Sequence, residues 1–326
     1  MSATEVSSET SNVDGFFPRQ KILSHLPGGS HYSEFRNRMA TVLCGDSKIP
    51  KTAFSDMKLL EALSEENSSL EDIAPCVKAD PSLNMKIMRI SRTAMYSRGV
   101  DVESFEDAYY RLGMREIRNL IYAEKVAGGF RKFKTDVDWM NFWKNSVLTA
   151  RLTEVLMSAA VGFKNFGFIN GLLNDTGSLV IREYFPEESM LIARAMQEEN
   201  KELIDAETEI FGFSHAHVAG LLCLKWRFPY NSSMGVYHHH SQLDEIEDNA
   251  TIRSYALATY LAENMAKAGL MLESGEDATE FLNYLYDSNV WNIFMSYVKD
   301  HDLINKIDLE KEVQDANQLA TTLLSS

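Results

Sequence analysis

Apolar residues recur at helical spacing along most of the chain, and this pattern constrains the fold more than any other feature. Over residues 137–162 and 251–270, apolar side chains return every three or four positions, as they do on one face of an α-helix. No segment combines sustained apolar–polar alternation with β-branched enrichment and hairpin turns, which strands would need. The sequence therefore predicts an all-α fold.

Capping residues and helix breakers indicate where the helices begin and end. A capping box at Ser68–Glu71 opens a short helix that we expect residues 75–77 to end, because proline disfavours a helix interior. The pair Asp80-Pro81 is typical of the start of the next helix. Ser104 begins a further helix, which Gly113 is expected to stop. We find no internal repeat and no heptad seam long enough for a coiled coil.

With 326 residues, the chain is long enough for one large helical domain with an accessory layer, or for two small domains. The first twenty residues are polar and acidic and lack the basic start and apolar stretch of a signal peptide. We expect four parts: a mobile acidic tail and leading helix over 1–46, a smaller helical subdomain over about 47–130, a bundle over about 135–242, and further helices over 243–326 that pack on the bundle.

The net charge of −15 argues against a protein that binds DNA through its phosphates, because the average field repels them. No run of eighteen apolar residues is present, so we expect no membrane insertion. The three cysteines, Cys44, Cys76 and Cys223, lie far apart in the sequence and form no ligand or disulfide pattern. They favour reduced thiols and a cytoplasmic location.

One basic stretch, from Arg111 to Lys134, interrupts the acidic chain. The plainer interpretation is a solvated helix face. The alternative is a docking patch for an acidic partner or a nucleotide phosphate. The residues of that patch would be Arg111, Arg115, Arg118, Arg131 and Lys132.

Histidines gather late in the chain, at His215, His217, His238, His239 and His240. The Asn174-Asp175 pair lies before them in an apolar run. Imidazole and carboxylate groups from several helices can hold metal ions in a bundle core and activate a water for phosphoester hydrolysis. The chain has no HExxH motif, however, and residues two apart do not share a helix face. The alternative is that most of these histidines cap helix ends or lie at turns.

Several short segments occur in an order that resembles one family. They are Ile49-Pro50, KADPSLNMKIMRISRTAMYS, AYYRLGMREIRNLI, WKNSVLTA, GLLNDTG, EIFGFSHAHVAGLLCLKWRFP and GVYHHH. Each segment is weak evidence alone, but their common order resembles the HDOD domain over about residues 47–242. This domain is a relative of the HD metal-dependent phosphohydrolases. The resemblance implies an HD-like multi-helix bundle with a smaller N-terminal helical subdomain.

The resemblance also matches the HD metal positions to residues of this chain. The first histidine falls at or beside Asn145, the His-Asp pair falls on Asn174-Asp175, and the last aspartate lies near Glu263. Both histidines are thus replaced by asparagine, a poor ligand for transition metals, and only Asp175 is unchanged. The chain lacks the Gly-Tyr-Pro stretch found after the paired histidines in relatives that cleave cyclic dinucleotides.

From the resemblance we expect a non-catalytic regulatory module of bacterial signal transduction that acts through contacts with signalling proteins and needs no metal or other cofactor. A homodimer is one form that such contacts could take. Asn174 and Asp175 would then hold helices together, with His215 or His238 as a partner for the aspartate. The alternative is a divergent metal-dependent phosphohydrolase or cyclic-nucleotide phosphodiesterase. It would use a divalent transition metal held by Asp175, His215, His238 and His239. A third possibility is a nucleotide-sensing domain that uses the basic stretch.

Overall fold

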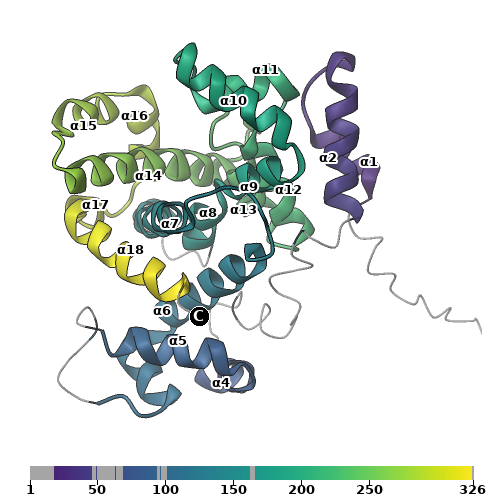
Figure 1. The fold of residues 1–326 in the computed structure, drawn as a ribbon. Helices are drawn as coiled ribbons and strands as arrows, with labels where there is room; N and C mark the ends of the chain where they lie inside the picture. The colour runs from purple at the N-terminus through teal and green to yellow at the C-terminus, as the bar shows by residue number, and fades with distance from the viewer. Residues whose placement is uncertain are drawn as a thin grey trace, which may run out of the picture.

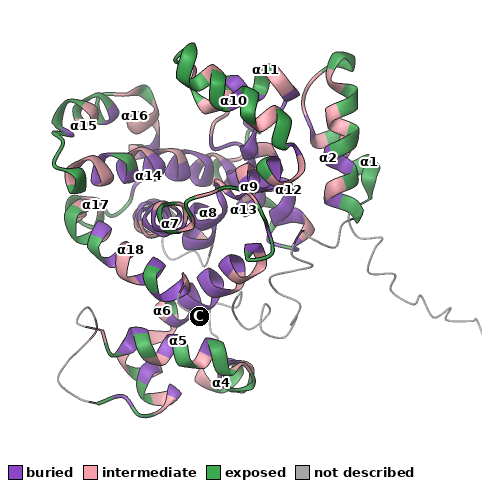
Figure 2. Ribbon diagram, viewed as in Figure 1, coloured by how far each residue is buried: buried purple, intermediate pink, exposed green. Residues whose placement is uncertain are grey.

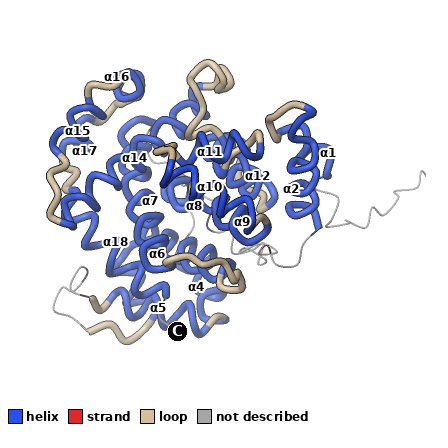
Figure 3. The backbone as a smooth tube through the Cα atoms, turned by 45° about the horizontal axis from the view of Figure 1, so that its top comes forward, coloured by secondary structure: helices blue, strands red, loops and turns tan. Residues whose placement is uncertain are grey.

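The computed structural model describes residues 18–45, 49, 63, 69–93, 96, 101–161 and 166–324. Every regular element within these ranges is a helix, which confirms the predicted all-α class (Figure 3). Residues 1–17, which hold most of the predicted acidic tail, lie outside the described residues.

The first half of the chain forms α1 (Arg19–His25), the 3₁₀ helix η2 (Ser30–Tyr32), α2 (Ser33–Gly45), α4 (Leu70–Ala79), α5 (Pro81–Ser91), α6 (Phe105–Phe130), α7 (Trp139–Val161), α8 (Gly167–Leu173) and α9 (Thr176–Tyr184). The second half forms α10 (Pro186–Glu198), α11 (Leu203–Phe211), α12 (His215–Lys225), α13 (Tyr230–Tyr237), α14 (Ala250–Ser274), α15 (Thr279–Tyr286), α16 (Asn289–Met295), α17 (His301–Asn305) and α18 (Leu309–Leu324).

The local signals place most helix ends correctly and miss two details. The capping box of α4 is formed by Ser69 and Asp72, one residue later than predicted. Pro75 lies inside α4 and does not end it. Proline removes one backbone hydrogen bond, but Pro75 is exposed, and the helix continues so that Val77 is buried. Gly113 breaks α6 as predicted, with φ of 80° and ψ of 162°.

Helix α7 lies at the centre of the bundle and packs against α8, α14 and α18 (Figure 1). Trp143, Val147, Leu148 and Leu152 on α7 are all almost completely buried. Figure 2 shows that α7 and α14 are largely buried, whereas α10 and α15 carry exposed outer faces. The core therefore surrounds α7, and burial of these apolar faces supplies the main driving force for folding.

Two helix pairs pack with their backbones in direct contact because a glycine lies between them. A Cβ atom on Gly177 of α9 would lie 2.0 Å from the carbonyl oxygen of His215 on α12. A Cβ atom on Gly171 of α8 would lie 2.6 Å from the carbonyl oxygen of Thr149 on α7. No side chain fits at these two points, so the two glycines allow the close spacing of both helix pairs.

Helix α18 joins the N-terminal helices to the bundle. The Lys86 ammonium on α5 donates hydrogen bonds to Glu124 on α6 at 2.7 Å and to the carbonyl oxygen of Leu323 at 2.9 Å. Arg131 donates to the same two residues, at 3.2 Å and 3.1 Å. Two cations thus meet the negative end of the α18 dipole.

Arg151 on α7 provides a second link to α18. Its guanidinium donates to Glu312 at 2.6 Å and to Asp315 at 3.3 Å, and it lies 3.8 Å from Glu116 of α6. The Arg151 side chain is 19% exposed, so these charges interact in a partly desolvated region. One cation therefore holds three carboxylates from two helices.

We predict that Arg151→Met lowers the free energy of unfolding by about 3 kcal/mol, because it leaves grouped carboxylates without their cation. Chemical denaturation at pH 7 measures the change. Arg194→Met is the matched control, because the Arg194–Glu198 pair is exposed and should contribute little. Equal stability of the two variants would contradict the role given to Arg151.

We predict that Gly177→Ala lowers the free energy of unfolding by about 1 to 3 kcal/mol, because α9 must move away from α12. Gly128→Ala on α6 is the control. Its nearest contact would be a Glu124 oxygen at 3.9 Å, and alanine favours a helix more than glycine does. Thermal unfolding followed by circular dichroism compares the two variants. A Gly177 variant as stable as the Gly128 variant would show that this contact is not tight.

Candidate functional site

A cluster of metal-competent side chains lies where four segments of the bundle meet. Asp175 links α8 to α9, and His215 is the first residue of α12. His239 and His240 lie in the turn that follows α13, and Glu263 is on α14. The contact at Gly177 brings the start of α9 against the start of α12, so Asp175 and His215 are neighbours.

The ligand atoms of these five residues form two groups that share His239. In one group, His215, His239 and His240 each offer a ring nitrogen. In the other, Asp175, His239 and Glu263 offer a nitrogen and two oxygens. Within each group all atoms lie within 4.8 Å of one another. Such spacing is compatible with ligands around one transition-metal ion.

The distances between ligand atoms show that residues of one group also lie close to residues of the other. His215 Nε2 lies 3.5 Å from Asp175 Oδ1. The Oε2 atom of Glu263 lies 3.9 Å from His239 Nε2 and 3.4 Å from His240 Nε2. The rings of His215 and His240 have their centroids 5.2 Å apart.

Two of the histidines are held by hydrogen bonds on the far side of the ring. His215 Nδ1 lies 2.7 Å from a carboxylate oxygen of Glu207, which also accepts a hydrogen bond from the backbone N–H of His215. His239 Nδ1 donates to the carbonyl oxygen of Val236 at 2.6 Å. Because Nδ1 is engaged in each ring, Nε2 is the atom directed toward the cluster. Metal-binding histidines in proteins are commonly oriented in this way.

Several polar atoms of the cluster and of the two asparagines, Asn145 and Asn174, are buried without a hydrogen-bond partner among the described residues. They are Nε2 of His215, Nε2 of His239, Oε2 of Glu263, Oδ1 of Asn145, and both Oδ1 and Nδ2 of Asn174. Buried polar groups normally have partners, so their concentration marks a site that accepts a ligand or water.

Burial and neighbouring carboxylates set the charges of the histidines. Burial alone would lower the pKa of His215, but the carboxylates of Glu207 and Asp175 raise it to about 9. Burial lowers the pKa of His240 to about 2 and holds that of His239 well below its ordinary value. His239 and His240 are therefore neutral at pH 7, as ligands must be.

The two acids of the cluster have pKa values shifted in opposite directions. Burial and the Glu263 carboxylate raise the pKa of Asp175. Burial would also raise the pKa of Glu263, but the Lys267 ammonium holds it below its usual range. The Lys267 ammonium lies 2.8 Å from Glu263 Oε1 and leaves Oε2 directed toward the histidines.

The structure brings together Asp175, His215, His239 and Glu263, which the sequence analysis singled out, and adds His240, which it did not include as a ligand. His238 is directed elsewhere: its Nδ1 lies 3.0 Å from the Ser241 hydroxyl. His239 and His240 lie in a turn, where consecutive side chains can face the same side. The sequence signal was the run of three histidines directly after a short helix.

The structure matches only part of the roles predicted for Asn174 and Asp175. Asn174 is completely buried but forms no hydrogen bond among the described residues, so a backbone bond is not its role there. Asp175 does face His215, as one alternative proposed, and not His238. The position matched to the HD histidines thus offers amide groups, which fit a transition metal poorly, and the imidazoles lie beside it.

The predicted basic docking patch is not one surface, because Arg118 is only 2% exposed. Helix α6 is buried along residues 117–124, so an arginine in that stretch points inward. Arg111 donates to the carbonyl oxygen of Ser91, and Arg131 is held at Glu124 and Leu323. Arg115, Arg131 and Lys132 are exposed.

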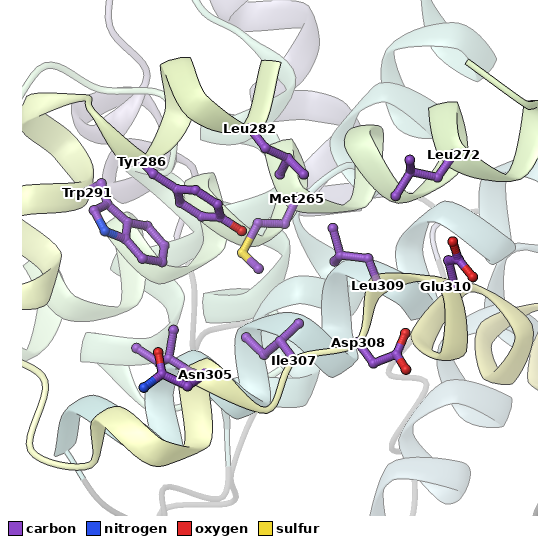
Figure 4. A pocket seen from close by; sticks show the side chains of 11 residues that line it. Met265, Leu272, Leu282, Tyr286, Trp291, Asn305, Ile307, Asp308, Leu309 and Glu310 are labelled. Atoms are coloured by element: carbon purple, nitrogen blue, oxygen red, sulfur yellow. The ribbon is translucent and has the colours of Figure 1, made fainter. Parts of the chain in front are cut away.

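A separate cavity of about 650 Å³ lies on the other side of α14, among α15, α16, α17 and α18 (Figure 4). Met265, Leu282, Tyr286 and Trp291 form its apolar part, and Asp308 and Glu310 lie at one end. Met265 is two residues from Glu263, so opposite faces of α14 serve the cavity and the histidine cluster. Within the described residues, no helix is long and apolar enough to cross a membrane.

Three crystal structures share this fold. An HDOD domain protein from Geobacter sulfurreducens matches with a TM-score of 0.72 and 17% identity, covering 89% of this chain and 98% of that one. A proposed phosphohydrolase from Shewanella amazonensis SB2B matches with a TM-score of 0.67 and 20% identity, covering 90% and 100%. A proposed signal transduction protein from Marinobacter aquaeolei VT8 matches with a TM-score of 0.62 and 17% identity, covering 93% and 69%.

At these identities the structural matches establish the fold alone. The comparison with curated proteins gave no match. The HDOD domain family matches residues 49–242, well over half of the chain, and this range contains four of the five clustered residues. Both the match and the fold agree with the expected HD-like bundle, and the chain belongs to the HDOD domain family.

Proposed function

We propose that this chain is a regulatory module of signal transduction that acts through contacts with other proteins and does not hydrolyse phosphoesters. The observation that carries the proposal is the chemistry at Asn145 and Asn174. Both HD histidine positions hold amide side chains, and Oδ1 of Asn145 and both polar atoms of the Asn174 side chain are buried without partners among the described residues. An amide neither binds a transition metal firmly nor accepts a proton near neutral pH, so this position cannot activate a water.

The burial of the remaining ligands supports the same conclusion. His215, His239 and Glu263 are each at most 5% exposed. A hydrolase needs its metal-bound water within reach of a bound substrate. The 650 Å³ cavity is on the opposite face of α14 and is lined by apolar and acidic residues, which suit a phosphate poorly.

That cavity supports the second half of the proposal, contact with a protein partner. Its apolar wall of Met265, Leu282, Tyr286 and Trp291 suits apolar side chains, and Asp308 and Glu310 suit a basic residue beside them. The partner segment we propose is therefore apolar with a flanking cation.

A second candidate function is metal-dependent phosphoester hydrolysis at a displaced site. The gathering of Asp175, His215, His239 and His240 favours it, since imidazole and carboxylate groups are the ligands of such enzymes. A substrate would have to reach atoms that are buried among the described residues.

We predict that the purified full chain, supplied with Mn²⁺, Fe²⁺ or Ni²⁺, does not hydrolyse bis(p-nitrophenyl) phosphate or a cyclic dinucleotide above a blank that contains only buffer and metal. The measurement is product release over a range of protein concentrations.

Turnover that rises with protein concentration and is lost in a folded Asp175→Asn variant would establish the second function instead. Asp244→Asn is the control for that variant, because Asp244 is exposed in the linker before α14 and should not affect turnover in either case.

A further inference from the structure

We propose that His215, His239 and His240, together with a carboxylate from Asp175 or Glu263, bind one divalent transition-metal ion. This site is displaced from Asn145 and Asn174, the positions matched to the HD histidines. It goes beyond the proposed function, because an ion held here would fix helices whether or not the chain catalyses a reaction.

The first support is the number and direction of unpaired ligand atoms. His215 Nε2, His239 Nε2 and Glu263 Oε2 are all buried, face the cluster and lack a hydrogen-bond partner among the described residues. Leaving such atoms unpaired costs free energy, which an ion bound to all three would remove. Three imidazoles and one carboxylate complete the four-coordinate set that Zn²⁺ and Co²⁺ accept.

The second support is the preorganisation of the rings. The Glu207 carboxylate holds His215, and the Val236 carbonyl holds His239, each through Nδ1. The ligand rings therefore need little reorientation on binding, and Glu207 also makes His215 a stronger electron donor. We assign Glu207 the role of a positioning residue.

The third support is the charge balance. The carboxylates of Asp175, Glu207 and Glu263 lie around the cluster, and Lys267 is the lysine that contacts it, through Glu263. His215 carries a proton in the metal-free protein, and an ion that binds its Nε2 must displace that proton. Three carboxylates then face one ammonium group, and one divalent cation balances the remaining negative charge, as buried charges require.

The ion would connect segments that are distant in sequence. Asp175 begins α9, His215 begins α12, His239 and His240 follow α13, and Glu263 is on α14. Because α14 also lines the 650 Å³ cavity through Met265, ion binding would restrain one wall of that cavity.

The test is Co²⁺ binding to the full chain after treatment with a chelator, followed by visible absorption and calorimetry. We expect one Co²⁺ per chain, displacement by Zn²⁺, and an increase in Tm with saturating Zn²⁺. His240→Ala should weaken Co²⁺ binding at least about 10-fold, whereas His238→Ala, at the adjacent histidine that faces Ser241, should leave it unchanged. His240 is the most exposed of the three histidines, so its variant is the one best tolerated by the fold.

A second pair of variants tests the positioning residue. Glu207→Gln should weaken Co²⁺ binding about 10-fold or more and leave one ion per chain, and Glu209→Gln, at an exposed residue of the same helix, should not. The proposal is overturned if the folded wild-type chain binds no stoichiometric Co²⁺, or if the His240 and His238 variants bind it equally. None of these measurements depends on hydrolytic turnover. The metal site can therefore be confirmed even if the proposed function is wrong, and the proposed function can be correct even if no metal binds.

Discussion

The backbone contact between α9 and α12 at Gly177 is the constraint on which the buried cluster depends. With no side chain between them, the first turns of the two helices meet, and Asp175 and His215 enter the same desolvated space. Desolvated charges must be compensated nearby, and Glu207 and Lys267 provide that compensation from α11 and α14. The distance between α9 and α12 and the pairing of the buried charges therefore depend on each other. If the helices moved apart, or if one charged residue were replaced, a buried charge would lose its partner.

The fold was largely predictable because its determinants are local. Each of them involves only residues that are close in sequence. The structure contains the predicted helices, the caps at Asp80 and Ser104, and the break at Gly113. The errors have local causes as well. Pro75 was expected to end a helix, yet the burial of Val77 outweighs one lost hydrogen bond. The last part of the chain, for which the sequence predicted further helices without their bounds, ends in four helices, α15 to α18.

The site was less predictable because it is made by tertiary contacts. Residue types drew attention to Asp175, His215 and His239, but sequence spacing could not show that His240 faces the same point while His238 faces away. That difference follows from the turn after α13, whose geometry is set by packing. Glu207 carried no signal, since a glutamate in an amphipathic helix is usually solvent-exposed, and only the structure shows it buried against His215. Arg118 shows the same limit: its residue type suggested a surface position in a docking patch, and only the structure shows that it is buried.

Helix α18 has a consequence for how the molecule is assembled during synthesis. Its partners Lys86, Glu124, Arg131 and Arg151 all precede it in the chain, so they leave the ribosome first. Until α18 is made, Lys86 and Arg131 can reach Glu124 but not the Leu323 carbonyl, and Arg151 can reach Glu116 but not Glu312 or Asp315. These links to α18 are therefore among the last contacts that the growing chain can form. A binding protein that captured the nascent chain before that point would meet these cations with part of their final partners still missing.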